Sequence, residues 1–429
     1  MKTAYKNGIL LDGSIDMEPT KGKCILVEDE MIVGVLDESV LMSGMGEYDI
    51  VDLQGAYIMP GLINLHVHLP ASGKTKKKPT DPVKLVKLMT RNNFMRKIMQ
   101  KMCEGFVKTE LLSGVTTLRS VGGVEDIDTK IRDRINCSEI VGPRILAGNM
   151  AISVEGGHMA GSLAYMANNE KEAIDYVQKI AKEHPDLIKL MITGGVLDAK
   201  VKGEPGVLKM KPEIVKAACD EAHRLGMVVA AHVESSEGVE VALANGVDTI
   251  EHGAKPSKRI LDLFKERQAV HIATLSPALP YALFDRSISN VSEMEQYNGN
   301  VVFEGIIECA KACLENDIPV GLGTDTGCPY ITHYDMWREL NYFHKYCGVS
   351  NRFALYTATA RNAKIAKIDH LTGTIEKGKC ADMIVCKKNP LEDLSVLRNL
   401  EMVIAKGHRI DQPKVKKMPE VEKELDKFL

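Results

Sequence analysis

The sequence predicts an α/β protein, a (β/α)8 TIM barrel with a small β-sandwich domain built by both ends of the chain. Its 429 residues are too many for one ordinary compact core but suit a barrel with an appendage. Between residues 60 and 365, short apolar strands alternate with amphipathic helical segments, which favours parallel βαβ units. Both ends of the chain instead show short strands separated by turn residues.

The two chain ends are expected to form one shared domain. Residues 1–59 contain β-type runs such as KCILVEDEMIVGVLD, and residues 366–429 contain GTIEKGKCADMIVC and LEMVIAKGHRI. We therefore predict that residues 1–59 form the N-terminal part of a β-sandwich, residues 60–365 the barrel, and residues 366–429 the C-terminal part of the sandwich.

The barrel prediction rests on eight candidate strands. In chain order they are LINLHVH, VTTLRSV, RILAGN, LIKLMITGG, VVAAHV, TIEHG, AVHIATL and VGLGTD. Eight parallel strands are the number that closes such a barrel. The segments between them have helical punctuation, as in KPEIVKAACDEAHRLG, with a proline near the start and a glycine after the last turn.

Composition narrows the classes of partner. Apolar residues make up 45%, charged residues 26%, and the formal net charge is -3, so we expect a small-molecule substrate and neither nucleic acid nor a membrane as partner. No run is long and apolar enough for a signal peptide or a membrane span, which predicts a cytoplasmic protein. A homo-oligomer is compatible with the sequence, but no feature selects one. The ten cysteines include no CxxC pair, and nothing near Cys309 and Cys313 in the sequence completes a zinc site.

Polar residues of a kind found in active sites lie in or at the ends of several predicted strands. They are His66 and His68 on the first strand, Lys189 on the fourth, His232 on the fifth, His252 on the sixth and Asp325 on the eighth. Barrel enzymes place their working residues at these strand ends. His66 and His68 are two apart, so both imidazoles point the same way from a strand. A metal site therefore explains the pattern better than a set of satisfied core histidines.

Lys189 needs a partner of its own, because burying an ammonium costs several kcal/mol unless it is paired or loses its charge. One reading is an ion pair with a barrel carboxylate such as Asp325. The other is that the desolvated, neutral amine adds carbon dioxide and becomes a carbamate that bridges two cations.

These residues resemble a known family. The ordered set MPGLINLHVH, the strand lysine, AHVES, IEHG and GTDTG is similar to the metal-dependent amidohydrolase superfamily over essentially the whole chain. TTLRSVGG, EGGHMAG and VDTIEHG resemble the branch that holds Xaa-Pro and Xaa-Arg dipeptidases and imidazolonepropionase-like enzymes. The resemblance implies two zinc ions, one held by His66, His68 and Asp325, the other by His232 and His252, with N6-carboxylysine at Lys189 between them.

The activity that this implies is hydrolysis of a C–N bond in a small substrate, a dipeptide or N-acyl amino acid, as in prolidases. A hydroxide between the two metal ions would attack the carbonyl carbon, and Asp325 would act as general base and then as general acid.

The sequence leaves more than one interpretation open for most of the candidate substrate contacts. By resemblance His158 would face the substrate as an oxyanion or carboxylate contact and take part in catalysis, although a plain loop histidine fits as well. Arg119 is either a bidentate substrate contact or a barrel ion pair. Val233 and Glu234 stand where many relatives carry an aromatic residue, which makes Glu234 a candidate substrate contact. The loop with Lys74, Lys76, Lys77 and Lys78 is either solvated or attracts an anionic substrate.

Two alternatives remain. A mononuclear imidazolonepropionase-type or deaminase-type hydrolase shares the barrel, but it would not need Lys189, and Glu234 lacks the spacing from His232 expected of a deaminase acid. A non-catalytic scaffold on the same fold would not need every ligand position to be filled.

Overall fold

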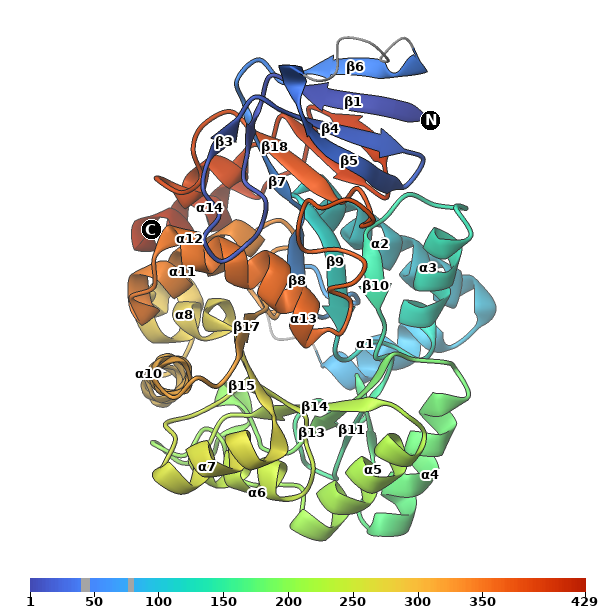
Figure 1. The fold of residues 1–429 in the computed structure, drawn as a ribbon. Coiled ribbons are helices and arrows are strands. Elements are labelled where there is room, and N and C mark those ends of the chain that lie inside the picture. Colours follow the sequence, from blue (N-terminus) through green and yellow to red (C-terminus); the bar gives the residue numbers. More distant parts are fainter. Residues whose placement is uncertain (40–46, 76–80) are drawn as a thin grey trace.

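A computed structural model describes residues 1–39, 47–75 and 81–429, and it contains a barrel of parallel strands with a β-sandwich at one side (Figure 1). Each of the eight predicted segments contains one barrel strand. They are β8 (Leu62–Val67), β9 (Val115–Ser120), β10 (Arg144–Leu146), β13 (Leu187–Met191), β14 (Val228–Val233), β15 (Thr249–His252), β16 (Val270–Ala273) and β17 (Val320–Leu322). The predicted barrel with its additional β domain is thereby confirmed.

Backbone hydrogen bonds join the strands of the barrel into a closed ring. Strands β8 to β10 pair side by side, and β13 to β17 pair in chain order. At one junction, the N–H of Asp186 donates to the carbonyl of Ala147 at 2.8 Å. At the other, the N–H of Asp325 donates to the carbonyl of His66 at 2.9 Å. Because all eight strands are parallel, their C-terminal ends meet at one mouth.

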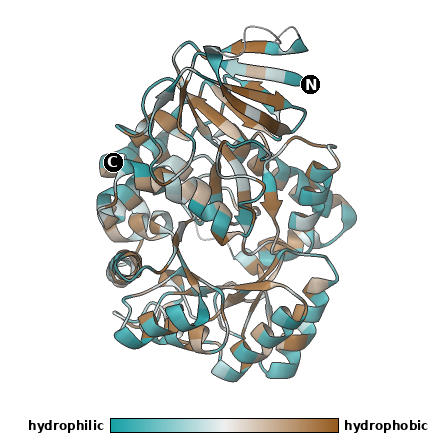
Figure 2. Ribbon diagram, in the orientation of Figure 1, coloured by the Kyte–Doolittle hydropathy of each residue, from teal (hydrophilic) through white to brown (hydrophobic). Residues whose placement is uncertain are grey.

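Amphipathic helices connect the strands and cover the outside of the barrel. They are α1 (Pro82–Thr90), α2 (Asn93–Leu112), α3 (Ile127–Asn136), α4 (Glu170–Ala181), α5 (Pro212–Arg224), α6 (Ser236–Ala244), α7 (Lys258–Arg267), α8 (Leu275–Leu283), α9 (Arg286–Ser289), α10 (Glu293–Glu315), α11 (Met336–Cys347), α12 (Asn351–Tyr356) and α13 (Asn362–Ile365). Figure 2 shows the barrel strands as largely hydrophobic and the outer helical turns as largely hydrophilic. Two short strands, β11 (Ala151–Ser153) and β12 (Ala164–Met166), extend the rim next to β13. Within the described ranges, no helix combines the length and apolarity needed to cross a membrane.

The sandwich domain consists of two sheets that draw on both ends of the chain (Figure 1). One sheet contains β1 (Lys2–Lys6), β4 (Lys23–Glu28), β5 (Met31–Asp37) and β6 (Asp49–Asp52). The other contains β2 (Ile9–Leu10), β3 (Thr20–Lys21), β7 (Tyr57–Pro60), β18 (Met383–Cys386), β19 (Met402–Ala405) and β20 (His408–Asp411). Tyr5 and Ile25 from the first sheet and Ile58 and Met383 from the second share one apolar core. Strand β7 pairs antiparallel with β18 and leads directly into β8, so this pairing fastens the sandwich to the barrel.

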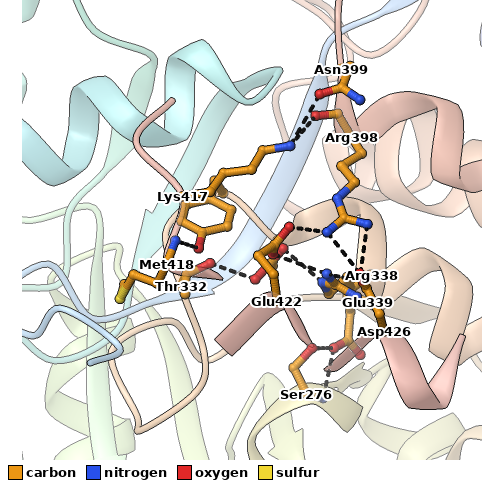
Figure 3. Close-up of polar contacts among 12 residues, drawn as sticks. Ser276, Thr332, Arg338, Glu339, Arg398, Asn399, Lys417, Met418, Glu422 and Asp426 are labelled. Atoms are coloured by element: carbon orange, nitrogen blue, oxygen red, sulfur yellow. Dashed lines mark hydrogen bonds and ion pairs between the residues drawn. The ribbon is translucent and has the colours of Figure 1, made fainter. Parts of the chain in front are cut away.

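The last helix, α14 (Pro419–Leu425), packs against helix α11. Its buried residues Val421 and Leu425 belong to the apolar cluster that contains the barrel core together with residues of β18 and β19. The physical reason for the packing against α11 is a buried arginine on that helix, Arg338, which binds Glu422 at 3.0 Å and Asp426 at 2.6 Å (Figure 3).

Glu339, the residue after Arg338, connects helix α11 to the segment that follows β16. The carboxylate of Glu339 accepts hydrogen bonds from the backbone N–H groups of Leu275, at 2.7 Å, and Ser276, at 2.9 Å, at the start of α8. The side chain of Ser276 binds it as well (Figure 3). Helix α11 therefore links the C-terminal helix to the loop region after β16.

We expect Arg338→Met to lower stability by about 3–5 kcal/mol, because it leaves buried carboxylates such as Asp335 and Glu422 without this counter-ion. Denaturant unfolding measures the loss. The control is Arg352→Met, which removes an exposed pair with Glu18 and should cost less than about 1 kcal/mol. Equal losses in the two variants would show that the buried network does not hold the C-terminal helix.

Candidate active site and metal centre

Two strand ends bring three potential metal ligands together at the barrel mouth. His66 and His68 come from β8, and Asp325 follows β17. The Nε2 atoms of His66 and His68 lie 3.4 Å and 3.1 Å from Oδ1 of Asp325. All three side chains are buried and close enough together to hold one ion. This arrangement follows from the strand period, because residues two apart project from the same face.

A second group of potential ligands lies beside the first. His232 is the last residue but one of β14, His252 ends β15, and Glu234 lies within 4.8 Å of both through its carboxylate. The ring centroids of His232 and His252 are 4.6 Å apart, and those of His66 and His252 are 5.0 Å apart. The backbone at His252 and Asp325 adopts positive φ angles of 69° and 55°. Such conformations cost about 1–3 kcal/mol and cluster at functional sites.

Hydrogen bonds on the far side of the first pair of imidazoles fix their orientation. Nδ1 of His66 lies 2.7 Å from Oε2 of Glu251. Nδ1 of His68 lies 2.8 Å from the carbonyl oxygen of Gly122, and since a carbonyl only accepts, this nitrogen carries the proton. The Nε2 atom of each ring then faces Asp325 and the site, the arrangement typical of metal-ligating histidines.

The second pair of imidazoles is held in the same way. Nδ1 of His252 lies 2.7 Å from Oγ1 of Thr274, and Nε2 of His232 lies 3.2 Å from the carbonyl oxygen of Gly194. Burial holds the pKa of both His232 and His252 well below its usual value. Both rings are therefore neutral at pH 7 and have a lone pair available for a metal ion.

Asp325 is ionised in this setting. Burial opposes its charge, but the neighbouring imidazoles of His66 and His68 outweigh that effect and hold its pKa well below the usual range. A carboxylate and two imidazoles match the nitrogen and oxygen ligands that zinc takes in proteins. The side chains at the mouth thus fit the predicted metal site.

Lys189 lies on β13 with 0% of its surface exposed, and its Nζ atom has no hydrogen-bond partner in the part of the chain that the structure describes. Burial lowers its pKa to about 8, against the opposing effect of the Glu251 and Asp325 carboxylates. No ion pair with Asp325 forms among the described residues, so the geometry does not favour that reading. A buried amine without a hydrogen-bond partner among these residues, beside two groups of potential metal ligands, instead fits a modified lysine.

Arg119 is engaged inside the barrel. Its guanidinium binds Oε1 of Glu251 at 2.7 Å and donates to the carbonyl of Leu65 at 2.7 Å, with 4% of the residue exposed. Burial opposes ionisation of Glu251, but Arg119 outweighs it and lowers the pKa of that carboxyl. Of the two predicted readings, the geometry favours the ion pair over a substrate contact. Sequence reasoning missed Glu251, although a charged residue within the buried run TIEHG signals such a partner.

His158 lies between β11 and β12 and stacks on His232, with ring centroids 4.2 Å apart and an interplanar angle of 6°. Its Nδ1 lies 2.5 Å from Oδ2 of Asp198, which also accepts from the N–H of Gly195. Burial raises the pKa of Asp198, but the hydrogen bond to His158 outweighs this effect and lowers it. Asp198 is a positioning residue for His158 that the sequence did not reveal, since nothing in the chain pattern pairs the two loops.

Glu234 is half-buried, and its Oε2 atom lacks a hydrogen-bond partner among the described residues. Burial raises its pKa well above the usual value, and the nearby Asp325 and Asp198 carboxylates add to the shift. It lines a cavity of about 800 Å³ that also contacts Gly253. In the lysine-rich loop, Lys74 is exposed, whereas residues 76–78 lie outside the described residues.

A family comparison now bears on these observations. The model of the amidohydrolase family matches residues 57–410. The chain belongs to the amidohydrolase family. Amidohydrolases are generally metal-dependent hydrolases that act on C–N bonds, and the predicted superfamily is confirmed.

Individual amidohydrolases resemble the chain along nearly its full length. A crystal structure of a Bifidobacterium longum protein assigned as a prolidase has 33% identity and a TM-score of 0.88, covering 99% of this chain and 98% of that one. A Xaa-Pro dipeptidase structure with bound methionine has 28% identity and a TM-score of 0.82, covering 96% and 100%. Imidazolonepropionase from Picrophilus torridus is 21% identical over 392 residues, 88% of this chain and 89% of that protein.

We expect Glu251→Gln to weaken metal binding by about 10- to 100-fold, because it loosens the contact that orients His66. Competition with a chelating indicator measures the metal affinity. Glu221→Gln is the control, since it alters an acidic group paired with Arg224 on α5 and should leave the affinity unchanged. Unchanged affinity in Glu251→Gln would mean that the carboxylate does not support the metal site.

Proposed function

We propose that this amidohydrolase cleaves the C–N bond of a dipeptide or N-acyl amino acid, in the manner of a prolidase, and that it uses two divalent metal ions. One observation carries the proposal: the amine of Lys189, which has no hydrogen-bond partner among the described residues, lies beside two adjoining groups of potential metal ligands. The likeness to the two structures named for prolidase or Xaa-Pro dipeptidase supports the choice of substrate class.

The proposed cofactors are two Zn²⁺ ions and a carboxylated lysine. His66, His68 and Asp325 would hold one ion, and His232 and His252 the other. When bound, the ions polarise the scissile carbonyl group and lower the pKa of water. Two ions also account for both groups of ligands, whereas one ion would leave the second group unexplained.

Lys189 would be modified in its neutral form. The lone pair of Nζ attacks carbon dioxide, the new N–C bond forms, and the amine loses a proton to solvent, which leaves a carbamate with two oxygens. A pKa of about 8 keeps a useful fraction of the amine neutral near physiological pH. The carbamate would then lie between the two groups of ligands.

Asp325 is the proposed general base and acid. Its ionised carboxylate lies at the mouth, where it would accept a proton from the attacking water and deliver it to the leaving amine nitrogen. His158, held at Nδ1 by Asp198, would present its other nitrogen to the substrate oxyanion or carboxylate. Glu234 lies beside His232 and His252 at the mouth and would contact the substrate.

A mononuclear hydrolase of the imidazolonepropionase type is the second candidate, and one observation favours it. The group of His66, His68 and Asp325 is by itself sufficient for one ion. The second group of ligands and Lys189 count against it. A catalytically inactive scaffold would leave all of these buried ligands without a role.

A substrate screen with metal analysis tests the proposal. Protein purified without chelator should contain close to two equivalents of divalent metal at the mouth, not counting any ion bound elsewhere in the chain, and hydrolyse members of a dipeptide and N-acyl amino-acid library. Released amines and amino acids are quantified, and protein stripped of metal serves as control. A single equivalent with full activity toward a cyclic amide, and none toward the library, would contradict the proposal and favour the mononuclear enzyme.

Reactivation of metal-free protein should depend on pH through Lys189. Only the neutral amine adds carbon dioxide, so at fixed dissolved carbon dioxide and fixed Zn²⁺ the initial reactivation rate should rise as the pH increases through about 8 and then level off. Activity is assayed at one common pH after each incubation. Lys189→Ala should recover no activity, and Lys179→Ala, on the outside of the barrel, is the matched control. Reactivation that is independent of carbon dioxide would rule out the carbamate.

A further inference from the structure

A second set of metal-binding side chains lies behind the barrel wall, away from the mouth. His271 on β16 is opposite Ile250 of β15 in the parallel register, and Ile250 belongs to the apolar core outside the strands. The next pair, Glu251 and Ile272, includes the carboxylate that points inward to Arg119. His271 therefore points outward, toward helix α10, and none of its surface is exposed.

Helix α10 supplies two thiols to the same place. Cys309 and Cys313 are four residues apart, so they lie on one face of the helix, and both are 0% exposed. A ring nitrogen of His271 and the two Sγ atoms all lie within 4.8 Å of one another. A zinc ion with ligands at about 2.0–2.3 Å fits among atoms at this spacing after a small inward shift. The histidine that the sequence lacked near this cysteine pair thus comes from a neighbouring strand.

The hydrogen bonding of His271 provides an independent indication of a ligand. Its Nε2 lies 2.7 Å from the backbone carbonyl oxygen of His252, so this nitrogen carries the proton. Its Nδ1 is buried and has no partner among the residues that the structure describes. A lone pair left unsatisfied in this way costs about 1–3 kcal/mol. A ring that donates one N–H to a carbonyl and keeps the other nitrogen free is the usual arrangement of a metal-ligating histidine.

A glycine directly after strand β15, Gly253, lies in close contact with this cluster. Gly253 has a φ of +82°, and a Cβ atom at this position would lie 2.9 Å from both Sγ of Cys309 and Nε2 of His271. Any larger residue would push the two side chains apart. A glycine here lets the end of β15 approach the thiol and the imidazole closely.

We propose that His271, Cys309 and Cys313 form a further metal site, distinct from the one at the mouth, that binds a thiophilic divalent ion such as Zn²⁺. Thiolate and imidazole ligands select zinc over magnesium, calcium or manganese. On binding, the two thiols release their protons to solvent and no electrons are transferred. The two thiolates then balance the charge of the ion, so the buried cluster is neutral overall. Zinc is held by three protein ligands where a water molecule takes the fourth position.

The site would act on the catalytic mouth through the backbone. The carbonyl oxygen that accepts from His271 belongs to His252, whose side chain is a predicted ligand at the mouth. An ion bound to His271 would hold this ring in place, and through its hydrogen bond to the His252 carbonyl it would restrict the position of the end of β15. The role is structural, since all three side chains are fully buried.

Cobalt substitution tests the proposal. Protein produced in cobalt-supplemented medium should show near-ultraviolet absorption from thiolate-to-Co²⁺ charge transfer, because the predicted ligands at the mouth contain no sulfur. The Cys309→Ala/Cys313→Ala variant should lose this band and contain one equivalent less cobalt than the wild type. Absence of the band in the wild type, or an equal band in the variant, overturns the proposal.

Three controls locate the sulfur. Cys219→Ala removes another buried thiol, on α5, and should keep the band. Cys328→Ala removes the thiol nearest to Asp325 in the sequence, and loss of the band in this variant would assign the sulfur to the mouth and overturn the proposal. His66→Ala/His68→Ala should abolish activity but keep the band, which separates this site from the proposed function.

A measurement on the wild type alone covers the case in which the double variant does not fold. X-ray absorption at the zinc edge should show sulfur scatterers at about 2.3 Å in addition to nitrogen and oxygen at about 2.0–2.2 Å. Only nitrogen and oxygen around zinc, with the mouth fully loaded, overturns the proposal.

Discussion

The interior of the barrel depends on the buried carboxylate of Glu251. It is fully enclosed, accepts from the guanidinium of Arg119, and lies 2.7 Å from Nδ1 of His66. A lone charge at this depth would cost several kcal/mol, and removing either partner would leave such a charge behind. Since Nδ1 of His66 is bound here, its Nε2 remains turned to Asp325. One ion pair within the wall thus sets the direction of a proposed metal ligand.

The other histidines at the mouth are oriented in the same way, by a hydrogen bond to one ring nitrogen. Each histidine there is held by one ring nitrogen, through a carboxylate, a hydroxyl or a backbone carbonyl, and keeps the other nitrogen for the site. The supporting groups come from neighbouring strands and the loops after them. Side chains that are already held in one orientation lose little conformational entropy when they bind a metal ion. His158 follows the same scheme, since Asp198 holds its Nδ1 while its ring stacks on His232.

Contacts between distant parts of the chain hold the mouth in place from outside. The pairing of β7 with β18 joins the two chain ends at the base of β8, the strand that carries His66 and His68. On the other side, Arg338 and Glu339 of α11 connect the C-terminal helix to the start of α8. The sandwich and the last helix are therefore not simple appendages, because each is fastened to an element that ends at the site.

The sequence alone determined the barrel, its eight strands, the family and the positions of the candidate ligands. The barrel, its strands and the ligand positions follow from local patterns: a period of two along each strand, helices between strands, and the rule that parallel strands end at one mouth. The family followed from the resemblance of the motifs at the strand ends. It also determined that Lys189 needed a partner, because one ammonium in an apolar run is costly wherever the run lies.

Only the tertiary structure decided which residues those side chains meet. It paired Arg119 with Glu251, placed Asp198 behind His158, left Lys189 without an ion pair among the described residues, and brought His271 to Cys309 and Cys313. It also joined α14 to α11 through the ion pair of Arg338 with Glu422. Such contacts join segments far apart in the chain, and they depend on strand register and helix packing. Those are properties of the whole assembled core, which no local pattern specifies.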